Sequence, residues 1–172
     1  MRIEPTSHPD VIVFASDVHD DARGFVLESW RRGQLPADLD QVNLAGSHGG
    51  TLRGLHYQLS PPQGKLVRCV TGEIFDVALD LRRGSPRFGQ WAAVTLREGD
   101  GRAVWIPPGF AHGFYAVATW NLVLYMMSGP RDVASERVIR WDSAGITWPA
   151  SPTILSTRDR EGVEMGEDVG LE

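Results

Sequence analysis

One lysine stands among sixteen arginines in this chain of 172 residues, and it follows a histidine by nine positions. Lys65 and His56 both lie in the segment Gly54-Leu-His-Tyr-Gln-Leu-Ser-Pro-Pro-Gln-Gly-Lys65. A neutral imidazole can accept a proton near neutral pH, and a fixed ammonium can stabilise an oxyanion. The pair has the right groups to remove a proton and hold the resulting negative charge. A surface lysine beside a structural histidine is the alternative interpretation.

A second histidine ends a motif that is typical of jelly-roll proteins. The segment Gly101-Arg-Ala-Val-Trp-Ile-Pro107-Pro-Gly109-Phe-Ala-His112 matches the second cupin motif, in which glycine is followed after five residues by Pro-x-Gly-x-x-His. Its glycines and proline turn a strand so that the histidine points into the mouth of the fold. The sequence therefore predicts that His112 lines a site.

The usual metal ligands of a cupin are missing from this sequence. Metal-binding cupins also use an earlier His-x-His pair and a glutamate. The corresponding stretch here is His56-Tyr57-Gln58, and Lys65 stands near the place of the glutamate. No His-x-His or His-x-x-x-His spacing occurs among the five histidines, which are His8, His19, His48, His56 and His112. We therefore expect acid–base groups and no metal in the site.

Composition and charge limit the class of protein. Hydrophobic residues make up 42% of the chain and charged residues 23%, which is typical of a globular protein, and the formal net charge is -5. The basic residues are scattered, so we expect no nucleic-acid surface. Without a membrane-length apolar run or a signal-peptide core, we expect no membrane partner and a cytoplasmic location. The one cysteine, Cys69, is expected to be a buried, unreactive thiol.

Short apolar runs separated by tight turns must position these residues. The runs lie at residues 66–70, 74–81, 91–96, 103–106, 113–118, 122–127 and 137–141. Regular strands of this kind indicate an all-β sandwich or barrel. Together with the motif at His112, they predict a cupin-type double-stranded β-helix, or jelly roll, with short peripheral helices.

The remaining segments give more local expectations. In the run 74–81, Val77 and Leu79 alternate with Asp76 and Asp80, as expected for a strand with one buried face. A short helix is expected near residues 29–34, ahead of Pro36. We expect residues 1–160 to form a single domain and residues 161–172 to be a loose acidic tail.

Taken in order, the motifs resemble the dTDP-4-dehydrorhamnose 3,5-epimerase family, metal-free cupins that epimerise a 4-keto-6-deoxyhexose nucleotide. The resemblance spans residues 11–160. It is carried by residues 21–28, 41–43, 52–58, 64–77, 80–86, 105–114, 136–141 and 155–159. It implies a substrate of the dTDP-4-keto-6-deoxy sugar class and a role in deoxysugar biosynthesis.

The implied reaction is inversion of the carbons beside a ketone. A hydrogen on such a carbon is acidic because the carbanion is delocalised into an enolate. Inversion needs a base on one face and a proton source on the other, and no redox cofactor. The 4-keto group flanks both C3 and C5, so one site can serve both centres.

The resemblance assigns roles to four catalytic residues. It implies that His56 is the base, Tyr125 the acid, and Asp159 the carboxylate that orients His56. The residues alone leave Asp76 and Asp80 open as orienting carboxylates. Lys65, together with Arg53, is expected to meet the O4 oxyanion or the nearby phosphate.

The resemblance also implies binding contacts and an assembly. The residues expected to contact nucleotide or sugar are Arg23, Glu28, Gln41, Asn43, Arg53, His112, Glu136 and Arg158. Arginine suits a bidentate grip on a diphosphate. By analogy with the family we expect a homodimer.

The chain departs from the family where an aromatic pair is usual before Glu136. Pro130 and Arg131 stand there instead, and Arg158 replaces a common lysine. These changes leave a mono-epimerase, inverting only C3 or only C5, as the main competing hypothesis. A metal-dependent oxygenase is disfavoured by the absent ligands. A catalytically silent module that binds sugar nucleotides is the remaining hypothesis.

Overall fold

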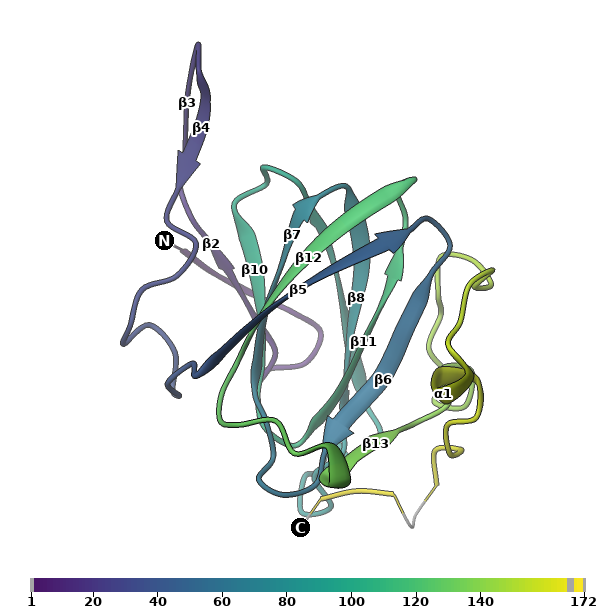
Figure 1. Cartoon of the computed structure of the whole chain (residues 1–172). Helices are drawn as coiled ribbons and strands as arrows, with labels where there is room; N and C mark the ends of the chain where they lie inside the picture. Colours follow the sequence, from purple (N-terminus) through teal and green to yellow (C-terminus); the bar gives the residue numbers. More distant parts are fainter. Residues whose placement is uncertain (1, 167–168, 172) are drawn as a thin grey trace.

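The computed structural model describes residues 2–166 and 169–171, and over these residues the chain forms two antiparallel sheets that face each other (Figure 1). In the described chain, one sheet has the strand order β1 (Arg2–Pro5), β2 (Ile12–Ala15), β10 (Arg102–Ile106), β7 (Lys65–Thr71), β12 (Trp120–Met127), β5 (Gln41–His48). The other has the order β13 (Glu136–Val138), β6 (Leu52–Gln58), β11 (Phe110–Ala116), β8 (Glu73–Asp80), β9 (Trp91–Arg97). The predicted all-β jelly roll is confirmed.

Alternating side chains from both sheets fill the space between them. The six-stranded sheet contributes Val67 and Val123, and the five-stranded sheet contributes Ile74 and Phe114, each with at most 1% of its surface exposed. Since successive side chains of a strand point to opposite faces, each strand also presents residues outward. Burial of this inner apolar cluster is what holds the two walls of the site together.

Both outer faces of the sheets are covered as well. Trp148 and Met165, from the segment after β13, pack with Val77 and Leu79 on the outside of the five-stranded sheet. Trp30 and Leu35 cover Trp105 on the outside of the other sheet. The expectation of one buried face for the run 74–81 was therefore wrong, because the irregular segments supply a second apolar layer.

Asp76 and Asp80 consequently lie in the interior, with 2% and 0% of their surfaces exposed. Asp80 accepts hydrogen bonds from Arg82 and Ser85, and Asp76 pairs with His112. Burial opposes ionisation of Asp80, but the hydrogen bonds from Arg82 and Ser85 outweigh this effect and hold the pKa of Asp80 at about 2. The alternating pattern correctly predicted that Asp76 and Asp80 share one face of the strand. That face was expected to be exposed, but it points into the space between the two sheets.

The seven predicted runs correspond to strands β7 to β13, whereas the predicted helix at residues 29–34 was wrong. Those residues form turns, in which the Gln34 side chain accepts the Arg31 backbone N–H and so competes with helical pairing. In the described chain the helices are a 3-10 turn, η1 (Val133–Ser135), and α1 (Thr157–Arg160). No helix of the described residues is long and apolar enough to cross a membrane.

The segment after residue 160 is attached to the body wherever it is described, which corrects the expectation of a loose tail. Val163 forms a bridge with Ile139, and Leu171, 7% exposed, forms one with Arg82. Residues 167–168 and 172 of this segment lie outside the described residues. Apolar burial explains the attachment, because Leu171 and Met165 belong to the covering layer of the five-stranded sheet.

Cys69 is buried in the inner cluster, as predicted. Its thiol donates to the backbone oxygen of Thr71. Burial, with nearby carboxylates such as Asp100 and Glu98, raises the pKa of the thiol to about 12. The reactive thiolate is therefore scarce at neutral pH.

Candidate active site

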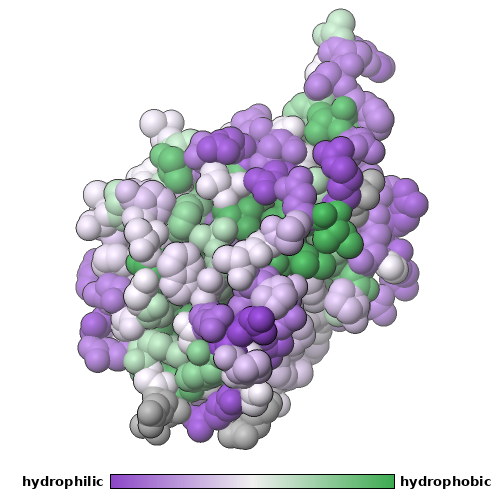
Figure 2. All heavy atoms as spheres, turned by 180° about the vertical axis from the view of Figure 1, so that it is seen from behind, coloured by the Kyte–Doolittle hydropathy of each residue, from purple (hydrophilic) through white to green (hydrophobic). Residues whose placement is uncertain are grey.

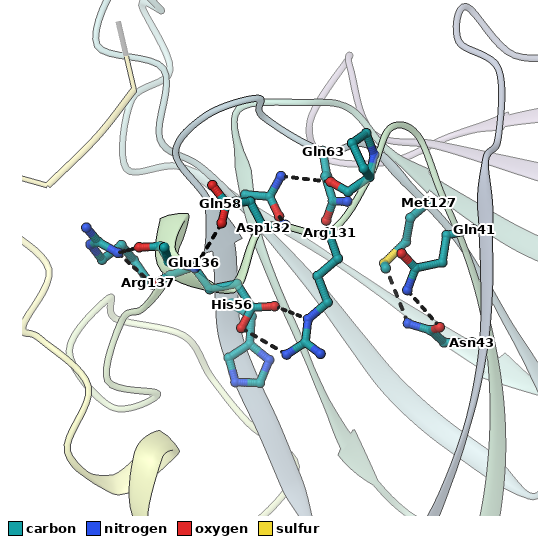
Figure 3. Close-up of polar contacts among 12 residues, drawn as sticks. Gln41, Asn43, His56, Gln58, Gln63, Met127, Arg131, Asp132, Glu136 and Arg137 are labelled. Atoms are coloured by element: carbon teal, nitrogen blue, oxygen red, sulfur yellow. Dashed lines mark hydrogen bonds and ion pairs between the residues drawn. The ribbon is translucent and has the colours of Figure 1, made fainter.

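A cavity of about 690 Å³ opens between the two sheets. Nine of the twelve predicted site residues line it, and these are Gln41, Asn43, Arg53, His56, Lys65, His112, Tyr125, Glu136 and Arg158. Figure 3 shows His56, Arg131 and Glu136 on one side of this space and Gln41, Asn43 and Met127 on the other. Gln58, Gln63 and Met127 also line it and were not predicted, since a neutral side chain carries little signal in a single sequence.

Strand register explains which residues share each wall. In the six-stranded sheet, Met127 of β12 lies opposite Gln41 of β5 on one side and Lys65 of β7 on the other. Two residues earlier in β12, Tyr125 lies opposite Asn43 of β5. In the five-stranded sheet, His56 of β6 lies opposite His112 of β11. The imidazoles and the phenol therefore stand on opposite walls of one cavity.

Two glycines let strands β6 and β11 approach closely beside the histidines. A Cβ on Gly54, whose φ is +124°, would lie 2.6 Å from the Gly113 Cα, and a Cβ on Gly113 would lie 2.7 Å from the Arg53 backbone oxygen. The register of the pair shifts at this point, between His112 and Phe114. Glycine is required at both positions because no side chain fits between the backbones.

His56 is held by Asp159, which lies 103 positions later in the chain. Its Nε2 lies 2.5 Å from Asp159 Oδ1, and the side chains are 39% and 5% exposed respectively. In neutral His56 this contact assigns the proton to Nε2 and leaves the Nδ1 lone pair as the basic site. The arrangement orients a base whose ring is still accessible from the cavity.

Asp159 is itself fixed by the start of α1. Ser156 is the N-cap: its hydroxyl accepts the Asp159 backbone N–H at 3.0 Å and donates to Asp159 Oδ2 at 2.8 Å. Burial disfavours the carboxylate, but hydrogen bonds from His56, Ser156 and the Gly54 backbone outweigh that cost and lower its pKa. Asp159 therefore stays ionised and can stabilise a protonated His56.

On the other side of the cavity, Tyr125 packs against His112 and Phe114. The rings of Tyr125 and His112 are 5.7 Å apart in an edge-to-face arrangement. Burial, and the nearby Asp76 carboxylate, raise the pKa of Tyr125 well above its usual range. The phenol is therefore protonated at neutral pH, and it gives up its proton only to a strongly basic partner such as an enolate carbon.

His112 is paired with Asp76 in the interior. Its Nε2 lies 2.8 Å from Asp76 Oδ2, and both side chains are at most 5% exposed. Burial lowers the pKa of His112 more than Asp76 raises it. A neutral His112 can line the cavity and hold a hydroxyl group without adding charge.

Lys65 occupies the edge of the cavity at the first position of β7. Its Nζ donates to the His56 backbone oxygen at 3.2 Å, so the ammonium lies close to the base. Burial lowers the pKa of Lys65 to about 8, although Asp76 and Glu136 oppose that shift. The site therefore keeps a cation whose charge is poorly solvated and free to act on a ligand.

The positions of Arg53, Gln41 and Asn43 suit contacts to a polar ligand. The Arg53 guanidinium donates to Ser47 Oγ and to the Gly46 backbone oxygen, both at 2.9 Å, which orients it along the cavity wall. Gln41 donates to the side-chain oxygen of Asn43 at 2.9 Å. These groups retain unused donors that face the cavity.

Arg23 and Glu28 lie outside this cavity. Arg23 is at the tip of the hairpin formed by β3 (Val18–Asp21) and β4 (Gly24–Leu27), which stands clear of the body (Figures 1 and 2). There it pairs with Asp21, and its side chain is 89% exposed. Glu28 pairs with Arg31 and lines a separate, smaller pocket. Within one chain, their predicted contact with the same ligand is therefore not formed.

Three charged residues meet at the mouth of the cavity. Glu136 binds Arg131 through Oε1 at 2.5 Å and Arg158 through Oε2 at 2.6 Å. Hydrogen bonds from Arg131 and Arg158 lower the pKa of Glu136 to about 2, against the effect of burial. In the described chain, Glu136 is the one carboxylate of the lining, against the four cations Arg53, Lys65, Arg131 and Arg158. The cavity suits an anionic ligand.

The described residues include no group of three His, Cys, Asp or Glu side chains placed to hold a metal ion. His56 and His112 each face a single carboxylate, and Lys65 lines the cavity with them. The arrangement is thus one of paired acids and bases, which suits proton transfer.

Comparisons with known proteins agree with this geometry. A family model described as dTDP-4-dehydrorhamnose 3,5-epimerase matches residues 5–167. The chain belongs to this family. The dTDP-4-dehydrorhamnose 3,5-epimerase of Shigella flexneri is 42% identical, and the alignment covers 94% of each chain. The epimerase is therefore an isomerase acting on a dTDP-sugar.

Solved structures of related epimerases superimpose closely. One is the 3,5-epimerase RmlC of Legionella pneumophila in complex with dTDP-4-keto-L-rhamnose, with a TM-score of 0.91, 36% identity and coverage of 95% and 92% of the two chains. Another is ChmJ of Streptomyces bikiniensis, a 3'-monoepimerase in complex with dTDP-quinovose, with a TM-score of 0.86, 32% identity and coverage of 93% and 86%. Both single and double inversion thus occur on this fold.

Proposed function

We propose that this epimerase inverts C3 and C5 of a dTDP-4-keto-6-deoxyhexose in succession, through enolates and without a cofactor. The observation that carries the proposal is the opposition of two proton-transfer groups across one cavity. His56 belongs to the five-stranded sheet, and Tyr125 to the six-stranded sheet. A sugar ring between them presents one face to a base and the other to an acid, which is what inversion requires.

The proposed reaction passes through an enolate of the keto sugar. His56 Nδ1 takes the proton from the carbon. The electron pair of the broken C–H bond becomes the C=C bond of the enolate, and the π pair of the ketone moves to O4. Asp159 stabilises the imidazolium, and Lys65 stabilises the oxyanion. The Tyr125 hydroxyl then protonates the carbon from the opposite face. The His56 imidazolium releases its proton to solvent and the Tyr125 phenolate takes one up, which restores both groups.

The nucleotide part of the ligand is proposed to lie toward the mouth. Arg53 and Arg158 have guanidinium groups that suit the diphosphate, while Gln41 and Asn43 offer amide groups to the nucleoside. His112 completes the pocket around the sugar, whereas Glu136 lies at the mouth beside the nucleotide part. The excess of cationic over anionic side chains in this lining supports that orientation.

A mono-epimerase is the second candidate, and a specific substitution favours it. Arg131 lines the cavity, at one of the two positions where the resemblance to the family implies an aromatic residue. A flat apolar ring and a charged guanidinium hold the nucleotide sugar differently, so the placement of the second carbon beside the base depends on this position.

Product analysis separates the two candidates. We expect that incubation with dTDP-4-keto-6-deoxyglucose, reduction of the keto group and analysis of the sugars will give products inverted at both C3 and C5. Products inverted at one carbon alone, even at long incubation times, would establish the mono-epimerase instead.

We also propose that the enzyme is a homodimer. The projecting hairpin exposes Phe25 and Val26, and edge strand β5 exposes Val42 and Leu44. Exposed apolar side chains on an edge strand favour pairing with another chain. In such a dimer, Arg23 and Glu28 would serve the site of the partner subunit. Light scattering is expected to give twice the mass of the chain.

Removing the Lys65 charge should slow the reaction and change its pH dependence. Lys65→Ala is expected to lower kcat roughly 10²- to 10³-fold, because a preorganised cation on the oxyanion is lost. In the unmodified enzyme, kcat/KM should fall above a pH of about 8, where the free Lys65 ammonium loses its proton. Initial rates across pH 6 to about 10 test both expectations.

Lys65→Arg is the matched control, because a guanidinium keeps its charge throughout that range. This variant should be slower but should lose the alkaline decrease. An unchanged alkaline decrease in Lys65→Arg would assign the titration to another group and contradict the role given to Lys65.

A further inference from the structure

The backbone on both sides of Arg131 is held by buried side chains. The Gln58 amide donates to the Pro130 backbone oxygen at 3.2 Å and accepts the Asp132 N–H at 2.7 Å (Figure 3). Gln63 donates to the Gly129 backbone oxygen at 3.0 Å. Gln58 and Gln63 are only 4% and 8% exposed, so the base of the Arg131 side chain is fixed over the cavity.

The Arg131 guanidinium is paired with the Glu136 carboxylate, which also has a second arginine partner. Nε and Nη2 of Arg131 contact the two oxygens of Glu136 at 2.5 and 3.2 Å. Arg158 contacts Oε2 of the same carboxylate at 2.6 Å. If Arg131 turned away, Glu136 would keep Arg158 as its partner. Releasing Arg131 therefore leaves no unpaired carboxylate in the mouth of the cavity.

A phosphate presents to a guanidinium the same paired oxygens as a carboxylate. Bidentate pairing of this type is favoured with either anion. The Arg131 side chain is 49% exposed, so it can exchange partners without unpacking the fold. Arg53, Lys65 and Arg158 surround the space it faces, which favours a ligand with more than one negative charge.

We propose that Arg131 is a specificity-determining residue that exchanges Glu136 for the diphosphate of the nucleotide-sugar ligand. This inference rests on the proposed function, since it assumes a nucleoside diphosphate in the cavity. Gln58 acts as a positioning residue, because it fixes the backbone from which Arg131 reaches. Arg131 thereby adds a phosphate contact to those of Arg53 and Arg158 in the same lining.

Calorimetric titration with dTDP, inorganic pyrophosphate and thymidine tests the inference directly. Arg131→Ala should weaken the binding of dTDP and of pyrophosphate about tenfold, because a bidentate charged pair is lost. Thymidine, which has no phosphate, should bind unchanged. Arg131→Lys should be intermediate, and Arg87→Ala, which removes an exposed arginine outside the cavity, should leave all three affinities unchanged.

Replacing Glu136, which competes with phosphate for Arg131, should change the affinity for pyrophosphate in the opposite direction. Glu136→Gln should strengthen pyrophosphate binding several-fold, because Arg131 no longer exchanges one anion for another. The gain should be smaller in the Glu136→Gln, Arg131→Ala double variant. A purely structural role of the Arg131–Glu136 pair predicts instead that both single variants weaken binding. Unchanged thermal unfolding midpoints would show that the variants fold.

The outcomes separate failure of this inference from failure of the proposed function. Equal affinities of Arg131→Ala and the unmodified enzyme for dTDP and pyrophosphate would overturn the inference alone. An equal loss of thymidine affinity would show that Arg131 stacks on the base, which also overturns it. Absence of dTDP binding by the unmodified enzyme would instead count against the proposed substrate, while pyrophosphate would still report on Arg131.

Discussion

Replacement of His56 by alanine should lower kcat/KM for the keto sugar nucleotide roughly 10³-fold, or about 4 kcal/mol of transition-state stabilisation. Without the imidazole, no other group described at that wall of the cavity can take the place of His56 as the base. Lys65 is protonated at neutral pH, and the neighbouring His112 is engaged by Asp76. Initial rates of keto sugar conversion measure the loss.

Binding should be nearly unchanged in the same variant, because His56 acts on the sugar carbon and the nucleotide lies toward the mouth. The dTDP affinity of His56→Ala is therefore expected to stay within about threefold of that of the unmodified enzyme. His48→Ala is a matched control, since His48 is exposed and packs on Trp120 outside the cavity. A His56→Ala variant that retains more than a tenth of the activity would remove His56 from the role of base.

Replacement of Tyr125 by phenylalanine should affect inversion more than proton exchange. The ring of Phe fills the same space against His112 and Phe114, so the packing is kept. The lost hydroxyl is the proton donor to the second face, and its removal is expected to slow inversion roughly 10²- to 10⁴-fold. His56 can still remove the proton and return one to the same face.

The measurement for Tyr125→Phe compares two rates in deuterium oxide. One is the rate of appearance of inverted sugar, and the other is the rate of deuterium entry into sugar that keeps its configuration. We expect the ratio of inversion to exchange to fall at least tenfold. If both rates fell by the same factor, Tyr125 would serve to place the substrate and would not be the acid.

Local sequence patterns predicted the centre of the fold well and its first third poorly. The runs that became β7 to β13 are apolar and end at turn residues, so periodicity alone locates them. The strands β3 and β4 are mostly exposed, and β5 has three exposed residues in its first half. Their sequence carries little apolar alternation, because they are edge or projecting strands that pack on one side at most.

The candidate site was predictable only in part for a different physical reason. His56 and His112 occur in local motifs, but the partner of His56 lies 103 positions away, and chain-distant pairing is set by the topology. Asp76 and Asp159 therefore could not be distinguished as partners before the strands were placed. Arg131 stands out in the sequence as a departure from the family pattern, but its contact with Glu136 depends on the loop geometry.

The central claim is that this cavity forms an enolate of a keto sugar nucleotide by removing a carbon-bound proton. The most direct measurement is incubation of the purified enzyme with dTDP-4-keto-6-deoxyglucose in deuterium oxide, followed by mass and NMR analysis of the sugar. Deuterium should enter at both C3 and C5 of the inverted product, and far more slowly with His56→Ala. A sugar that leaves the enzyme without deuterium at either carbon would contradict the claim.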